Sequence, residues 1–109
     1  AGIATLTGAK IAVQYRRGYP VLVNHAGQTE IAAQVADEVA GRERVSRDMP
    51  PLMGAEDFAF MLQARPGAFI FLGNGDSAGW HHPAFDFNDE AAVFGTSYWV
   101  RLVETRLPA

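Results

Sequence analysis

Apolar residues recur along much of the chain with the period of helices. Six of them form one stripe between Ile31 and Ala40, which predicts an amphipathic helix with Asn24 as its N-cap and Gly41 at its end. A shorter helix is predicted after Gly54 and closed by Pro66-Gly67, with three residues facing inward: Phe58, Met61 and Leu62. Asn88 is predicted to cap a long final helix whose inner stripe is Ala91, Phe94, Tyr98 and Leu102.

Two other segments carry the patterns of strands. Lys10 to Tyr15 alternates polar with apolar residues, as a half-buried strand does. Ala68 to Leu72 is an unbroken apolar run, which is typical of a strand covered on both faces in a parallel sheet. Helices that alternate with strands predict an α/β fold. We expect Phe69 to Leu72 to be an inner strand that ends beside the next loop.

Composition narrows the classes of protein. A chain of 109 residues is at most one domain with one modest core, and its 49% apolar and 19% charged residues are typical of globular proteins. Nine basic and twelve acidic residues give a net charge of −3, so the sequence does not predict the basic surface that binds nucleic acid or anionic lipid. No apolar run approaches the ~20 residues that span a bilayer. The absence of cysteine fits a cytoplasmic protein.

The first residues read as the tail of a helix. Ala1 to Leu6 has no basic segment before an apolar stretch, so it is not a signal peptide, and Gly8 is predicted to end the helix. The chain is therefore expected to be a piece of a longer protein.

His81-His82-Pro83 follows a predicted strand and the glycine-rich loop from Gly73 to Gly79, a place where α/β proteins build sites. Imidazole is the commonest neutral metal ligand, so the pair suggests metal coordination. Adjacent residues of an extended segment point in opposite directions, so both are not expected on one ion. Hydrogen-bonded structural histidines are the alternative.

Other candidate sites are weaker. Glu56 and Asp57 stand at a predicted helix start beside Gly54, where carboxylates suit the helix dipole and free backbone N–H groups suit an anion. The Gly73–Gly79 loop matches neither phosphate-binding glycine motif. His25 is expected to be a surface or capping residue. No G-x-S-x-G elbow is present, so a serine triad is not indicated, and one histidine loop with one acidic pair leaves a metal hydrolase site incomplete.

Three stretches nevertheless resemble one family over essentially the whole chain. They are MGAEDFAFMLQARPGAFIFLGNG (residues 53–75), HHPAFDFNDEA (81–91) and YRRGYPVLVN (15–24). They resemble the C-terminal part of hippurate hydrolase-like amidohydrolases, the branch of the metallo-aminoacylase and carboxypeptidase family that includes N-acyl amino acid and auxin-conjugate hydrolases.

The resemblance implies a two-metal catalytic domain with an inserted lid domain. Residues 1–18 would be the end of the lid, and residues 19–109 the closing segment of the catalytic domain. His81 would be a metal ligand and His82 its neighbour, because serine often fills the second position of the motif. Three residues would line the substrate side of the cleft: Gly54, Ala55 and Glu56. The neighbouring Asp57 would have a structural role instead.

The resemblance also implies what lies outside this chain. The remaining metal ligands and the catalytic glutamate would be upstream, so the chain supplies no catalytic residue and is expected to be inactive alone. The substrate would be an N-acyl amino acid and the cofactors two divalent ions, with Zn, Mn, Co and Ni left open. The parent would be a cytoplasmic homo-oligomer, a dimer through the lid, that binds neither nucleic acid nor membrane. The alternatives are a deacetylase of N-acetyl amino acids or of intermediates such as N-acetyl-diaminopimelate, and a stand-alone, non-catalytic α/β binding module.

Overall fold

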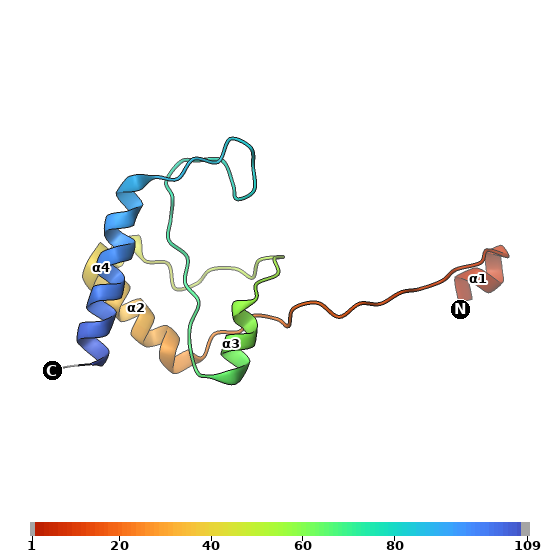
Figure 1. Ribbon diagram of the computed structural model, residues 1–109, viewed down its shortest axis with the longest axis horizontal. Coiled ribbons are helices and arrows are strands. Elements are labelled where there is room, and N and C mark those ends of the chain that lie inside the picture. Colours follow the sequence, from red (N-terminus) through yellow and green to blue (C-terminus); the bar gives the residue numbers. More distant parts are fainter. Residues whose placement is uncertain (1, 108–109) are drawn as a thin grey trace.

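The computed structural model describes residues 2–107, and its regular elements are all helical (Figure 1). They are α1 (Gly2–Thr7), α2 (Ala26–Ala40), the short 3-10 helix η1 (Arg42–Arg44), α3 (Phe58–Ala64) and α4 (Asp89–Arg106). The predicted helix tail that Gly8 ends is confirmed by α1, with Gly8 at a φ of 69°. Within the described residues no helix is long and apolar enough to cross a membrane.

Helix α2 follows from its apolar stripe, which puts Ala32 and Val35 in the interior. Gly41 ends the helix as predicted, with a φ of 87° that suits a residue without a Cβ. The predicted cap at Asn24 is wrong. His25 occupies the N-cap position without a side-chain cap hydrogen bond, and the Asn24 amide instead bonds the backbone N–H and C=O of Phe69, both at 2.8 Å.

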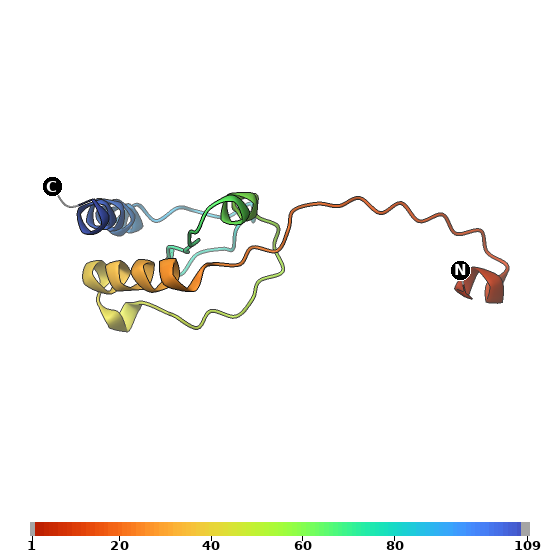
Figure 2. The same cartoon turned by 90° about the horizontal axis from the view of Figure 1, so that it is seen from below.

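The core lies where α2 packs against α4: α4 crosses over α2 in Figure 1, and the two helices lie in adjacent layers in Figure 2. Ala32, Val35 and Tyr98 form its buried cluster, and Leu102 packs against it. The predicted stripe of α4 is thus confirmed at three positions, since Ala91 is buried as well. Phe94 is the exception, because it is 36% exposed. Asn88 caps α4 as predicted by accepting a hydrogen bond from the Glu90 N–H.

Helix α3 begins at Phe58, four residues after Gly54, and ends before Pro66-Gly67 as expected. Its inward side is carried by Ala59 and Leu62, both buried. Met61 was expected to face inward, but it is 62% exposed.

The predicted α/β fold is contradicted, because residues 2–107 contain helices and no strand. Neither Lys10–Tyr15 nor Phe69–Leu72 is part of a sheet. A strand exists only through a backbone ladder with a second strand, and the described residues offer none to either segment. Phe69 is instead paired with the Asn24 side chain. The run is also not covered on both faces, since Ile70, Phe71 and Leu72 are 40%, 46% and 49% exposed.

The molecule is elongated, with extents of 68 × 35 × 20 Å. Its radius of gyration is 20.0 Å, against about 13 Å for a compact chain of this length. Residues 8–23 form an arm that carries α1 away from the other helices (Figures 1 and 2). The accessible surface is 9440 Å², whereas a compact protein of 11.8 kDa exposes about 5,900 Å². The core is therefore smaller than the sequence suggested.

Candidate functional site

The two predicted histidines lie on a long excursion of the chain between Asn74 and Asn88, which we call the histidine loop (residues 75–87). The loop turns tightly at its histidines, where the His82 N–H donates to the Gly79 carbonyl at 3.1 Å. His81 has a φ of 63°, and among the described residues it is the only non-glycine residue with a positive φ. Such a conformation is uncommon outside glycine, although histidine is among the residues that adopt it more often, and residues held in it cluster at active sites and ligand-binding segments.

The chain's three histidines differ in what their ring nitrogens do. His82 Nδ1 accepts a hydrogen bond from the Ala84 N–H at 3.0 Å, and His25 Nδ1 accepts one from the Gly67 N–H at 3.2 Å. A neutral imidazole that accepts at Nδ1 carries its proton on Nε2, so it has no second lone pair to offer. The His81 ring is exposed and makes no hydrogen bond within the described part of the chain. His81 is thus the histidine with a lone pair available for a ligand.

The other two histidines make local hydrogen bonds. The His82 ring holds the turn that follows it, and its place as the neighbour of a metal ligand stays a prediction. His25 stands at the N-cap position of α2, but it is half-buried and ties α2 to Gly67 rather than capping the helix.

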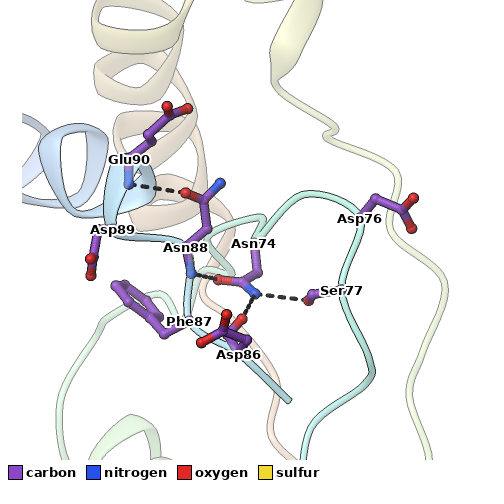
Figure 3. Close-up of a pocket in the computed structure, with 8 residues that line it drawn as sticks. All are labelled: Asn74, Asp76, Ser77, Asp86, Phe87, Asn88, Asp89 and Glu90. Atoms are coloured by element: carbon purple, nitrogen blue, oxygen red, sulfur yellow. Dashed lines mark hydrogen bonds between the residues drawn. The ribbon is translucent and has the colours of Figure 1, made fainter. Parts of the chain in front are cut away.

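The neck of the histidine loop is closed by Asn74, which the sequence did not single out (Figure 3). Its Nδ2 donates to the Asp86 carbonyl at 2.7 Å and to Ser77 Oγ at 2.8 Å, and its Oδ1 accepts from the Asn88 N–H at 2.8 Å. A shallow open hollow of about 410 Å³ lies over the neck, lined by Asn74, Asp76, Ser77, Asp86, Phe87, Asn88, Asp89 and Glu90.

The second candidate region precedes α3. Gly54 and Ala55 are exposed, and a Cβ on Gly54 would meet nothing within 4 Å, so this corner is open. The half-buried Glu56 uses its Oε1 to accept from the Phe58 N–H at 3.0 Å. Asp57 occupies the N-cap position but makes no side-chain cap hydrogen bond. At this helix start the side-chain hydrogen bond is made by Glu56, while the roles expected for Glu56 and Asp57 in a substrate cleft stay predictions.

A row of aromatic rings connects the two regions. Phe58 at the start of α3 contacts Phe69, Phe69 contacts Phe71, and Phe71 stacks on Trp80, with centroids 5.6, 5.1 and 5.2 Å apart. The row thus runs from Phe58, which follows Glu56 and Asp57, to Trp80, which precedes His81. Part of this row could have been predicted from the sequence. Phe69 and Phe71 are two residues apart in a non-helical segment, and side chains at that spacing in an extended chain point to the same side.

Comparison with known proteins identifies the chain's family. Residues 3–105 match the sequence model of the family described as "Peptidase family M20/M25/M40". The chain belongs to this family. The resemblance seen in the three sequence stretches is thereby confirmed.

Three similar proteins illustrate the match. YhaA of Bacillus subtilis, to which an amidohydrolase activity is attributed, is 38% identical over 97 residues, covering 84% of this chain and 24% of that protein. The hippurate hydrolase of Campylobacter jejuni is 30% identical, and an N-acetylcysteine deacetylase of B. subtilis is 31% identical; each match covers 93% of this chain and 26% of the relative. The chain spans about a quarter of the length of these relatives. No solved structure matches it significantly.

Enzymes of this family are generally metal-dependent. Within residues 2–107, no three side chains of His, Cys, Asp or Glu are grouped so that they could hold a metal ion. The described residues therefore fit one ligand of a metal centre, the free imidazole of His81, and do not form a complete centre.

Proposed function

We propose that this chain is the C-terminal part of a metal-dependent amidohydrolase that cleaves the amide bond of N-acyl amino acids. The family match over residues 3–105 supports the reaction class. The relatives named hippurate hydrolase and N-acetylcysteine deacetylase support an N-acyl amino acid as the substrate. The observation that carries the chain's own part is the exposed His81 ring, which no hydrogen bond to a described residue occupies.

In this proposal His81 holds one of two divalent ions through a ring nitrogen. When bound, the ions supply a Lewis acid that polarises the scissile amide and lowers the pKa of a water molecule. Gly54, Ala55 and Glu56 line the substrate side of the cleft, where the open Gly54 corner leaves room for a ligand to approach the backbone. The Glu56 carboxylate is engaged by the Phe58 N–H, so we assign it a role in shaping this corner. The identity of the metal, among Zn, Mn, Co and Ni, is part of the proposal's test.

The domain division belongs to the same proposal. Residues 1–18 would be the end of a lid and residues 19–109 a catalytic segment; Ala1, Pro108 and Ala109 lie outside the described residues. The arm of residues 8–23, which carries α1 away from the other helices, supports such a division (Figure 2). Val13 and Tyr15 on this arm, both 84% exposed, and Leu6 in α1, 88% exposed, are apolar side chains suited to contact with further protein. A dimer through the lid and a cytoplasmic location are proposed with it.

The test uses the complete protein that carries this chain, loaded in turn with each of the four metals. Amino acid release is measured from benzoylglycine and from N-acetylcysteine. We expect turnover of both, with benzoylglycine preferred; preference for N-acetylcysteine would favour the deacetylase alternative, which the N-acetylcysteine deacetylase relative supports. No turnover of any N-acyl amino acid with any metal would contradict the proposal.

The 109-residue chain alone provides the companion test. A single ligand cannot assemble a two-metal centre, so the isolated chain is expected to release no amino acid above the rate of its own His81→Ala variant. Turnover above that control would mean that the chain holds a complete site by itself, which the proposal denies.

A further inference from the structure

Asn74 joins the two ends of the histidine loop. Its side chain reaches Asp86 and Asn88, twelve and fourteen residues further along the chain. Both hydrogen bonds that cross the neck within the described residues involve this one amide, and no backbone–backbone hydrogen bond there accompanies them. We propose that Asn74 is a positioning residue, which closes the neck of the histidine loop and so fixes the place of His81.

The geometry requires an amide at this position. The half-buried Asn74 donates two hydrogen bonds through Nδ2 and accepts one through Oδ1. An aspartate has the same shape, but when ionised it can only accept, so it would leave the Asp86 carbonyl and Ser77 Oγ without their donor. It would also add a negative charge to a hollow already lined by Asp76, Asp86, Asp89 and Glu90 (Figure 3). Like charges this close are unfavourable.

The tie connects the loop to the helical core. Asn88, whose N–H bonds Asn74, also caps α4 by accepting from the Glu90 N–H at 3.0 Å. Helix α4 in turn packs on α2 through the buried Tyr98. Asn74 thus links the loop to the part of the molecule that burial holds in place.

A second contact orients the loop near its tip. Trp80 stacks on Phe71 with the rings 14° from parallel, and His81 follows directly with its φ of 63°. The neck fixes where the loop begins and ends, and the stack limits how its tip can turn. Together they restrict His81 before any ligand binds, so that less conformational entropy is lost on binding. This is the physical advantage of a preorganised site.

The inference rests on the proposed function for its link to activity, but not for its effect on the loop. The experiment compares Asn74→Asp with Asn24→Asp in the complete protein. Asn24 is a matched control, because it is also a half-buried asparagine whose amide holds backbone groups, those of Phe69, outside the histidine loop. Ser77→Ala removes one of Asn74's three partners and leaves both bonds across the neck.

Three quantities are measured: hydrogen–deuterium exchange of the peptide covering residues 75–88, the affinity for Zn²⁺ against a chelator, and kcat and KM separately. Asn74→Asp should speed exchange in residues 75–88 and lower Zn²⁺ affinity and kcat by about tenfold or more, as the loss of a residue that supports a metal ligand does. Asn24→Asp should speed exchange in residues 67–72 and change Zn²⁺ affinity by less than about twofold. Ser77→Ala should fall between wild type and Asn74→Asp.

Unchanged exchange in residues 75–88 of Asn74→Asp would overturn the inference. So would equal losses of Zn²⁺ affinity in Asn74→Asp and Asn24→Asp, since Asn74 would then act only through general stability. A wild-type protein that binds Zn²⁺ but hydrolyses no N-acyl amino acid would refute the proposed function alone, because exchange and Zn²⁺ affinity still decide the role of Asn74.

Discussion

The α2–α4 pair and the histidine loop are held in place by different forces. In the helical pair, side chains are removed from water: Val35 is 1% exposed and Tyr98 7% exposed. In the loop, every residue from 79 to 87 is exposed, including the large Trp80 side chain, which is 59% exposed. The loop takes its shape from the Asn74 amide, from the turn at His82 and from one ring stack.

This difference teaches where stability and function should separate. Burial is roughly proportional to area and has no direction, so it stabilises the helical pair without specifying the loop. Hydrogen bonds contribute little net stability each, but they fix position. Substitutions in the pair should therefore change the free energy of unfolding, whereas substitutions around His81 should change ligand binding.

The largest stability effect is expected from Val35→Ala. It deletes two methyl groups from the largest fully buried side chain of the described residues, which should lower the free energy of unfolding by about 2 kcal/mol. Urea unfolding of the chain measures it, with the exposed Val103→Ala, 55% exposed in the wild type, as the control. An equal effect from both substitutions would mean that the α2–α4 contact is not the core.

A smaller effect is expected where the pair and the loop meet. Asn88→Ala removes the side-chain acceptor of the Glu90 N–H and should cost about 1 kcal/mol of unfolding free energy. It leaves the Asn88 backbone N–H bonded to Asn74, so hydrogen exchange in the loop should change little. Asn88→Ser, which keeps a capping oxygen, should recover most of the loss; a cost unrelieved by serine would argue against capping.

The smallest effect is a pH dependence confined to the helical pair. Burial raises the pKa of the Tyr98 phenol above its ordinary value of 10.0, because the core disfavours the charged phenolate. The contribution of the neutral phenol to the free energy of unfolding is fully present below the unfolded-state pKa, and it is lost as the pH rises through the higher folded-state pKa. The urea midpoint should thus fall between about pH 9 and 11 more in the wild type than in Tyr98→Phe. Identical pH profiles would contradict it.

The helices could be predicted from the sequence because an apolar stripe reports burial on one side. This worked for α2, for three of the four inner positions of α4 and for the extent of α3. The α/β fold could not be obtained in this way. An apolar run such as Phe69–Leu72 reports a tendency to be covered, but a strand also needs a partner for its backbone, which residues 2–107 do not supply.

The site was predictable where chemistry is carried by residue type and less so where it depends on geometry. His81 and the Gly54 corner were found from their motifs, although their roles stay predictions. Asn74 was missed because its partners are backbone groups twelve and fourteen residues away, and a backbone group has no sequence signature. The hydrogen bond from the Phe58 N–H to Glu56 could not be predicted, because adjacent carboxylates at a helix start can be told apart only by their hydrogen bonds.

The central claim, that His81 is this chain's contribution to a metal centre, is tested most directly by replacing the two adjacent histidines separately in the complete protein. His81→Ala should lose bound metal and about 10³-fold of the turnover of an N-acyl amino acid. His82→Ser should keep its metal and most activity, because a serine oxygen can accept the Ala84 N–H that His82 Nδ1 now accepts. Equal loss of metal in both variants, or full metal content in His81→Ala, would contradict this role of His81.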